Sequence, residues 1–137
     1  MNSNRTILLI EDDMVDIMTV KRAIRELRIQ NPLHVARNGE EGIKYLITHK
    51  ERLPFIILLD INMPRMNGIE FLKIVKQNRL LRTIPIIILT TSKEEQDRYD
   101  SFDLGISGYM VKPVDYPQFV NLIQTINAYW SLSELPR

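Results

Sequence analysis

Four short runs of apolar residues stand out along the chain, at 7–10, 55–59, 84–89 and 108–111. These runs do not alternate apolar with polar positions, a pattern typical of strands buried on both faces of a parallel sheet. A fifth segment, 33–36, follows a turn-forming Asn-Pro pair and is predicted to be a strand nearer the sheet edge. The pattern therefore predicts a five-stranded parallel sheet that is covered by helices on both sides.

Between these runs, apolar residues recur every three or four positions, which is the period of one helix face. The stretch 92–105 adds a predicted helix with Ser92 as its N-cap, Glu94 and Glu95 in its first turn, and Gly105 as its C-terminal cap. Strand and helix alternate five times, which predicts a right-handed, doubly wound α/β fold. The apolar stripes of the other four helices are Ile17, Val20, Ile24 and Leu27; Ile43, Leu46 and Ile47; Phe71, Leu72 and Val75; and Phe119, Leu122, Ile123 and Ile126.

The length of 137 residues fits one domain that buries a core without disulfides. We expect a single domain over residues 1–137, with its core at about 5–130, a short tail at 131–137 and no output domain. The chain has no cysteine, no signal-peptide pattern and no long apolar run, which fits a cytoplasmic protein. Its net charge of +1 gives no overall attraction to nucleic acid or to a membrane, so neither is expected as a partner.

Chemically capable side chains follow four of the five predicted strands. Glu11 and Asp12 follow the first run, Asp60 follows the run at 55–59, Thr90 follows the run at 84–89, and Lys112 follows the last. In open α/β sheets, ligands bind beyond the carboxyl ends of the strands, so these side chains are expected to meet at one edge.

Carboxylates that meet in this way repel one another unless a cation or protons join them. Carboxylate oxygens suit Mg²⁺, which in proteins often holds a phosphate as well. Lys112 and the hydroxyl of Thr90 add groups that interact with phosphoryl oxygens, and a carboxylate such as Asp60 can form an aspartyl-phosphate. The combination indicates phosphoryl transfer, for which positioning and charge neutralisation are the main requirements.

Each of these residues also has an ordinary structural interpretation. Asp12 or Asp13 can cap the helix that follows, with Asp16 in its opening turn, and we favour this interpretation for Asp13 and Asp16. Thr90 and Lys112 taken alone are compatible with a strand end and a solvated surface. The functional interpretation rests on their conjunction, because unrelated residues would not all fall at strand ends on one edge.

Four segments of the chain resemble the receiver domain of two-component response regulators: LLIEDD, IILLDINMPRMNGIEFL, IPIIILTTS and GYMVKPVD. The resemblance covers about Thr6 to Tyr129, and the segments keep the family's spacing. The chain is further similar to single-domain regulators that are paired with bacteriophytochromes or hybrid histidine kinases. The resemblance implies a flavodoxin-like (βα)5 fold with strand order 2-1-3-4-5, an order that chemotaxis regulators of this fold exemplify.

The resemblance also implies a role for each residue of the site. Asp60 would be the phosphoacceptor and a metal ligand, with Asp12 binding Mg²⁺ directly. Glu11 would act on the metal through water, and Asn62 would offer its backbone carbonyl. Gly68 matches a loop glycine of the family, for which a positive φ is the expected physical reason.

Three further roles concern the phosphoryl group and its effect. Thr90 would bind the phosphoryl group, and Lys112 would neutralise its charge. Tyr109 resembles the aromatic switch residue of the family, which is coupled to Thr90.

These implications favour a phosphorylation switch that is not an enzyme with its own substrate turnover. A histidine kinase or phosphotransfer protein would phosphorylate Asp60, and the signal would leave through protein–protein contacts, with a homodimer through the face of the fourth helix, fifth strand and fifth helix as one form. An aspartyl phosphatase of the haloacid-dehalogenase kind is disfavoured because it needs an acid at position 62, where this chain has Asn62. A degenerate receiver that serves only as a binding module is disfavoured by the intact Asp60, Thr90 and Lys112.

Overall fold

A five-stranded parallel sheet forms the centre of the computed structural model, which describes residues 5–112, 115, 117–122 and 124–125. The strand order is β2-β1-β3-β4-β5, and each neighbouring pair is parallel, so the predicted order is confirmed. The edge position predicted for residues 33–36 is confirmed as well, because β2 lies at one end of the sheet. The strands are β1 Ile7–Ile10, β2 Leu33–Ala36, β3 Ile56–Leu59, β4 Ile86–Thr90 and β5 Gly108–Val111.

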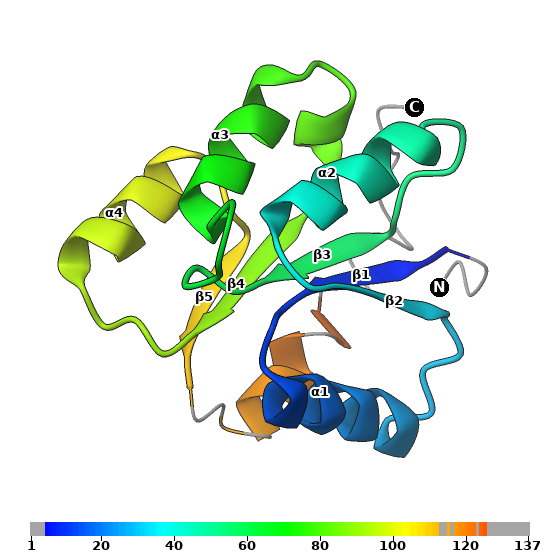
Figure 1. Ribbon diagram of the computed structural model, residues 1–137. Helices are drawn as coiled ribbons and strands as arrows, with labels where there is room; N and C mark the ends of the chain where they lie inside the picture. Colours follow the sequence, from blue (N-terminus) through cyan, green and yellow to red (C-terminus); the bar gives the residue numbers. More distant parts are fainter. Residues whose placement is uncertain (1–4, 113–114, 116, 123, 126–137) are drawn as a thin grey trace.

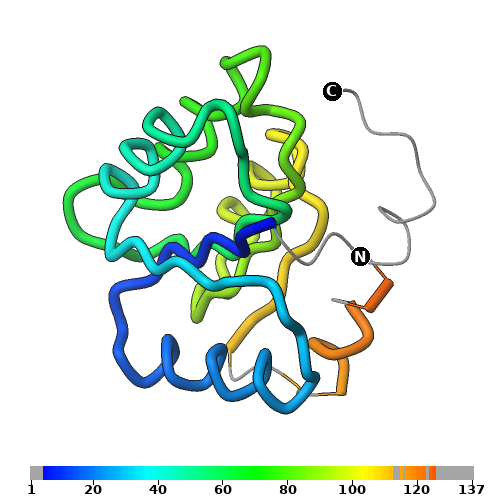
Figure 2. Tube along the Cα trace, turned by 90° about the vertical axis from the view of Figure 1, so that its right-hand side faces the viewer, coloured from blue at the N-terminus to red at the C-terminus, as the bar shows by residue number. Residues whose placement is uncertain are grey.

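Helices cover the sheet on both sides (Figure 1). The segment α1 lies with the helical residues 117–122 on one side, while α2 and α3 lie on the other, and a view turned by 90° shows the same division (Figure 2). In the part of the chain that the structure describes, no helix combines the length and the apolar character needed to cross a membrane. The helices are α1 Met14–Glu26, α2 Gly39–Thr48, α3 Gly68–Gln77 and α4 Glu95–Asp103, and a 3-10 turn, η1 Leu81–Thr83, precedes β4.

The unbroken apolar runs are explained by two separate cores. Leu8 and Ile10 of β1 pack into the cluster on the side of α2 and α3, whereas Ile7 and Leu9 pack into the cluster on the side of α1. Successive side chains of a strand point to opposite faces, so a strand between two helical layers needs an apolar residue at every position. All four of these residues are at most 1% exposed.

Among the described residues, the predicted helical stripes are buried or partly buried at every position except one, which is exposed. Ile17, Val20 and Ile24 of α1 lie in the core, as do Leu46 and the three predicted residues of α3. The prediction is wrong for Ile47, which is 52% exposed, because its neighbour Leu46 takes the inward position and adjacent helical residues point about 100° apart. Ile123 and Ile126 lie outside the described residues.

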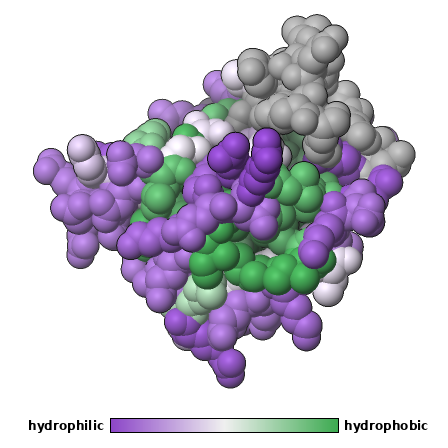
Figure 3. All heavy atoms as spheres, turned by 90° about the horizontal axis from the view of Figure 1, so that it is seen from above, coloured by the Kyte–Doolittle hydropathy of each residue, from purple (hydrophilic) through white to green (hydrophobic). Residues whose placement is uncertain are grey.

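Hydrophilic residues cover most of the molecule seen from above in Figure 3, with a hydrophobic area between them.

Side-chain caps fix where three of the helices begin. Asp13 accepts the backbone N–H groups of Val15 and Asp16 at the start of α1, which confirms its predicted capping role. Asn38 caps α2. Asn67 forms a reciprocal capping box at the start of α3.

The predicted start of α4 is wrong, whereas its predicted end is confirmed. The helix begins at Glu95 with Glu94 in the N-cap position, and no side chain caps it. The Ser92 hydroxyl lies before the helix, where it donates to the side chain of Asp97 and accepts the Glu94 N–H at 3.3 Å. Gly105 follows the C-terminal end with φ +85°, and the N–H groups of Gly105 and Ile106 bond back to carbonyls of the last turn. This arrangement is a Schellman motif, for which glycine is the preferred residue.

Candidate functional site

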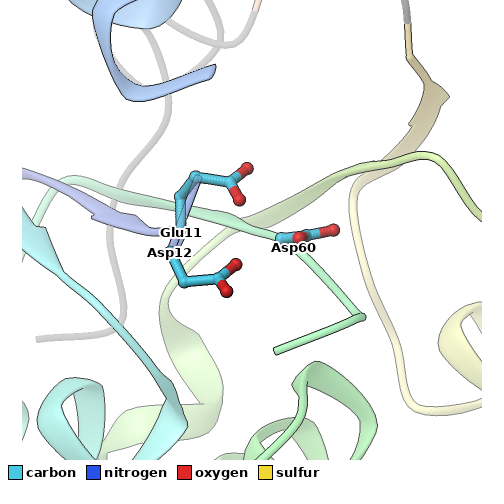
Figure 4. A group of neighbouring side chains, drawn as sticks. All are labelled: Glu11, Asp12 and Asp60. Atoms are coloured by element: carbon cyan, nitrogen blue, oxygen red, sulfur yellow. The ribbon is translucent and has the colours of Figure 1, made fainter. Parts of the chain in front are cut away.

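Three carboxylates come together at the carboxyl edge of the sheet (Figure 4). Glu11 and Asp12 follow β1 directly, and Asp60 follows β3 directly. The two strands are neighbours with Ile10 paired to Leu59, so the residues after them necessarily meet. Each carboxylate offers one oxygen, and these oxygens lie within 4.8 Å of one another. Three hard oxygen donors in this span suit a divalent cation, so the predicted acidic site is assembled in the structure.

Lys112 brings its ammonium group into the same cluster from the end of β5. Its Nζ lies 2.6 Å from Oε1 of Glu11, 2.7 Å from Oδ2 of Asp16 and 3.9 Å from Oδ2 of Asp60. The other oxygen of Asp60, Oδ1, accepts the N–H of Ile61 at 2.8 Å. The lysine therefore hydrogen-bonds two acids and faces the third, Asp60, at a distance too long for a direct hydrogen bond.

Burial sets the protonation of this cluster. Burial, with a smaller contribution from the charge of Asp60, raises the pKa of Glu11 from 4.5 to about 7, because the hydrogen bond to Lys112 offsets only part of this effect. Burial lowers the pKa of Lys112, but its hydrogen bonds to Asp16 and Glu11 outweigh this, and the pKa lies above its usual 10.5. The lysine is thus charged at neutral pH. Glu11, with a pKa near neutrality, can give up its proton there when a cation binds.

A pocket of about 550 Å³ opens over these groups. Asn62 contributes to its wall from the loop after Asp60, while the metal-binding role of its carbonyl stays a prediction. Thr91, and not the fully buried Thr90, is among the residues that form the wall. The lining residues are Glu11, Asp12, Asp13, Met14, Val15, Asp16, Asp60, Asn62, Thr91 and Lys112.

Metal binding at this pocket is expected to depend on pH through Glu11. With a pKa of about 7, Glu11 is mostly protonated at pH 6 and mostly ionised at pH 8, so a cation must displace one proton at the lower pH. We expect Mg²⁺ affinity, measured by calorimetric titration, to be about tenfold tighter at pH 8 than at pH 6. The variant Glu11→Gln should lose this pH dependence, and equal wild-type affinities at the two pH values would contradict the prediction.

The same shift makes the metal-free protein sensitive to pH. The folded state holds the Glu11 proton up to about pH 7, whereas the unfolded chain releases it near 4.5. The folded state therefore binds more protons between these values, and the free energy of unfolding falls as pH rises through this window.

The backbone and side chain of Ser92 connect the end of β4 to α4 and β5. Its N–H donates to Oγ1 of Thr90 at 3.3 Å, and its hydroxyl donates to Oδ2 of Asp97 at 2.6 Å. Its carbonyl oxygen accepts the Tyr109 hydroxyl at 3.1 Å. Thr90 and Tyr109 are thus joined through Ser92, while the phosphoryl-binding role of Thr90 stays a prediction.

The ring of Tyr109 is partly buried against α4. The Arg98 guanidinium lies 5.6 Å from the centre of the ring, and the Phe102 ring lies 6.4 Å from it. Burial raises the pKa of Tyr109, which keeps its hydroxyl protonated and able to donate to Ser92. The switch role of Tyr109 stays a prediction that these contacts make testable.

Position 68 requires a glycine because there is no room for a side chain, and not because of its backbone conformation. Its φ is not positive, so the reason predicted from the sequence is wrong. A Cβ on Gly68 would contact the carbonyl oxygen of Asp60 and would lie 2.8 Å from Cα of Ile61. The first residue of α3 therefore packs directly on the backbone that carries Asp60, and its N–H donates to the Ile61 carbonyl at 2.9 Å.

Two residues of the site were missed or underestimated by the sequence analysis. Asp16 was assigned to the opening turn of α1, but its carboxylate binds Lys112. Arg37 follows the edge strand β2, and its guanidinium donates to the backbone carbonyl of Asp12 at 2.8 Å. For Asp16 the only local signal is its place one helical turn after Asp12, and nothing local identifies its partner.

Comparisons with known proteins agree with this site. A family model described as the response regulator receiver domain matches residues 7–124. Response regulator Rcp1 of Synechocystis is 32% identical over 133 residues, which covers 94% of this chain and 90% of Rcp1. The probable methanogenesis regulatory protein FilR2 of Methanothrix harundinacea is 31% identical over 127 residues, covering 90% of this chain and 82% of FilR2.

Solved structures of similar sequence share the fold. The phosphorylated cyanobacterial phytochrome response regulator RcpA has a TM-score of 0.81 at 29% identity, covering 98% of this chain and 99% of RcpA. The Mn²⁺-bound form of Rcp1 has a TM-score of 0.79 at 32% identity, with 97% and 99% covered. The bacteriophytochrome response regulator AtBRR has a TM-score of 0.78 at 36% identity, with 98% and 99% covered.

Proposed function

The chain belongs to the response regulator receiver family, and on that premise we propose that Asp60 accepts a phosphoryl group from a histidine kinase or a phosphotransfer protein. The single observation that carries the proposal is the position of Asp60, whose buried carboxylate lies between two other acids and a lysine at the mouth of one pocket. The family consists of signalling switches, so turnover of a separate substrate is not its function.

The geometry distinguishes the two oxygens of Asp60. Oδ1 accepts the Ile61 N–H, whereas Oδ2 faces the ammonium of Lys112 at 3.9 Å. We assign Oδ2 as the nucleophile that attacks phosphorus. A new O–P bond forms, the P–N bond of a phosphohistidine breaks, and the imidazole nitrogen leaves with the bonding pair and takes a proton from solvent.

The residues of this chain neutralise the charge that the phosphoryl group brings. Lys112 is charged and lies within reach of Oδ2, so it can approach a phosphoryl oxygen with little movement. A divalent cation, which we propose to be Mg²⁺, would be held directly by Asp12, Asp60 and the carbonyl of Asn62 and through water by Glu11, and it would supply charge neutralisation for in-line transfer. The Mn²⁺ of the solved Rcp1 structure supports a metal of this class.

The signal is proposed to leave the site through Ser92. A phosphoryl group that hydrogen-bonds the Thr90 hydroxyl would draw this hydroxyl away from the Ser92 N–H. The carbonyl of the same Ser92 accepts the Tyr109 hydroxyl, so a change at Ser92 would reach Tyr109. Movement there alters the surface of α4 and β5, where the exposed aromatic residues Tyr99 and Phe102 are available for protein contacts. A homodimer through this face, a cytoplasmic location and a single-domain organisation remain predictions from the sequence.

Chemical phosphorylation with a small donor tests the proposal. The protein is incubated with Mg²⁺ and acetyl phosphate, its intact mass is measured, and the modified residue is located by peptide mapping. We expect one phosphoryl group per chain, on the peptide that contains Asp60, and no adduct when EDTA replaces Mg²⁺. An unmodified mass under all conditions, or a phosphoryl group on another peptide, would refute the proposal.

A further inference from the structure

We propose that Asp16 is a positioning residue for phosphoryl transfer, which holds the ammonium of Lys112 toward Asp60 when a cation occupies the acidic cluster. The inference rests on the proposed function and adds a residue outside the three-acid cluster to its machinery. The observation behind it is the pair formed by Oδ2 of Asp16 and Nζ of Lys112, which are 2.7 Å apart although the residues are 96 positions apart in the sequence.

The backbone of Lys112 is fixed, but its side chain needs a guide. Its N–H donates to the Thr90 carbonyl at 2.7 Å, which anchors the main chain at the end of β5. The side chain beyond it is a flexible stem of four carbons, so only contacts near the ammonium can hold that group in one direction. An ammonium has three N–H donors, and two of them are engaged by Glu11 and Asp16 at hydrogen-bond distance. With two donors fixed, the direction of the third is fixed too, and Asp60 is the remaining acid within 4.0 Å among the described residues.

Asp16 is the partner of Lys112 that does not also belong to the cation cluster. The cluster consists of Glu11, Asp12 and Asp60. A cation bound there attracts the Glu11 carboxylate and competes with its bond to Lys112, because both positive groups interact with the same carboxylate. The Asp16 carboxylate lies outside this competition and keeps its bond to the ammonium.

The place of Asp16 in the fold makes it a rigid anchor. It lies in the first turn of α1, where its N–H donates to the capping side chain of Asp13 at 3.2 Å. Its side chain is 31% exposed, in contrast to 3% for Glu11, so water shares the charge that it carries toward the pocket. A helix start that is capped in this way positions a carboxylate more precisely than a loop does.

A simpler role for Asp16 is to stabilise the positive N-terminal end of the helix dipole. Such a role would not depend on Lys112, and an uncharged residue of any kind would abolish it. The positioning role, in contrast, needs an oxygen that accepts the ammonium N–H, and it disappears when Lys112 is absent. The two roles are therefore separated by comparing Asp16→Asn with Asp16→Ala, since both remove the charge and only asparagine keeps an acceptor.

The test measures phosphorylation by acetyl phosphate at saturating Mg²⁺ in a double-mutant cycle of Asp16→Ala and Lys112→Ala. We expect Asp16→Ala to lower the initial rate about five- to tenfold in the wild-type background, and less than about twofold in the Lys112→Ala background. Asp16→Asn should recover most of the rate. The matched control Glu26→Ala removes an exposed carboxylate from the same helix, about 15 Å further along, and should not change the rate.

A second readout does not depend on phosphorylation. The side-chain ¹⁵N–¹H signal of Lys112 is recorded by NMR with Mg²⁺ bound, where an ammonium held by Asp16 exchanges its protons slowly. We expect the signal in the wild type, Glu26→Ala and Asp16→Asn, and its loss in Asp16→Ala, whose folding is checked by its amide spectrum.

The outcomes distinguish the two proposals. A wild type that takes no phosphoryl group refutes the proposed function, whatever the NMR signal does. Equal rates for wild type and Asp16→Ala, or a rate loss that is the same with and without Lys112, overturn the positioning role alone. Equal rates for Asp16→Asn and Asp16→Ala also overturn it, because charge and not hydrogen bonding would then be responsible.

Discussion

The substitution Asp60→Asn is expected to abolish the phosphoryl adduct and, at the same time, to make the metal-free protein more stable. Asparagine has no anionic oxygen to attack phosphorus, so the adduct is lost completely. Its side-chain oxygen can still accept the Ile61 N–H that Oδ1 of Asp60 accepts in the native protein. The fold around position 60 is therefore retained, while one of three crowded carboxylates is removed.

The gain in stability comes from relieved repulsion. Asp60 is only 6% exposed, and its charge helps to raise the pKa of Glu11. At pH 8 and without metal, where Glu11 is mostly ionised, we expect urea denaturation to show a free energy of unfolding about 1–2 kcal/mol higher than that of the wild type. At pH 6 the difference should be smaller, since Glu11 then carries its proton.

Magnesium should reverse this order. A ligand that binds the folded state stabilises it according to its affinity, and Asp60→Asn has lost one donor. Saturating Mg²⁺ is therefore expected to stabilise the wild type more than the variant. The control Glu51→Gln, in the turn before β3, changes the net charge equally and should alter neither stability nor the adduct. A full adduct on Asp60→Asn, or a variant less stable than the wild type at pH 8 without metal, would contradict the prediction.

The second large effect is expected for Gly68→Ala. On helix propensity alone the change should stabilise α3 by up to about 1 kcal/mol, because alanine is a better helix former. The tertiary structure reverses the sign, since the added Cβ would contact the Asp60 carbonyl and the Cα of Ile61. Overpacking costs about 1–3 kcal/mol, and we expect the upper end because backbone atoms cannot change rotamer to make room.

A second glycine provides the control for this prediction. Gly105 has φ +85°, and the nearest atom to an added Cβ is Cε of Lys76 at 4.0 Å, so its requirement is conformational. Asparagine tolerates this backbone conformation better than alanine does, so Gly105→Asn should cost less than Gly105→Ala. At Gly68 the order should be the opposite, because a larger side chain makes the contact worse.

Urea denaturation of Gly68→Ala, Gly68→Asn, Gly105→Ala and Gly105→Asn measures the effect, and the rate of phosphorylation by acetyl phosphate reports whether Asp60 has moved. We expect Gly68→Ala to lower both stability and the phosphorylation rate, and Gly105→Ala to lower stability alone. Native stability in Gly68→Ala would mean that the loop after β3 yields to the extra carbon. In that case Gly68 does not fix the position of Asp60.

Sequence patterns predict what depends on nearest neighbours along the chain. The runs at 7–10 and 55–59 specify strands buried on both faces, and the residues after parallel strands must share an edge. The sequence therefore predicts that Glu11, Asp12 and Asp60 lie together. Asp13 and Gly105 were identifiable for the same reason, because helix caps are local.

Where the sequence analysis was wrong, the packing of the folded chain decided the outcome. Ser92 is of a residue type that often caps helices, but α4 begins only at Glu95. The Ser92 hydroxyl donates to Asp97 five residues later, and its carbonyl accepts the Tyr109 hydroxyl from β5. Gly68 resembles a turn glycine, but the reason for a glycine there is that the backbone of Asp60 leaves no room for a Cβ. Ile47 has the spacing of a core residue, but α2 is rotated so that Leu46 faces inward.

The sequence by itself thus determined the fold, the edge at which chemistry takes place and the identity of the nucleophile proposed for it. Only the tertiary structure decided how the charges at that edge are shared. Lys112 binds Glu11 and Asp16 and faces Asp60 because the fold brings the end of β5 close to the ends of β1 and β3 and to the first turn of α1, and no local pattern specifies that approach. The shifted pKa of Glu11 has the same origin, since burial and neighbouring charge exist only once the chain has folded.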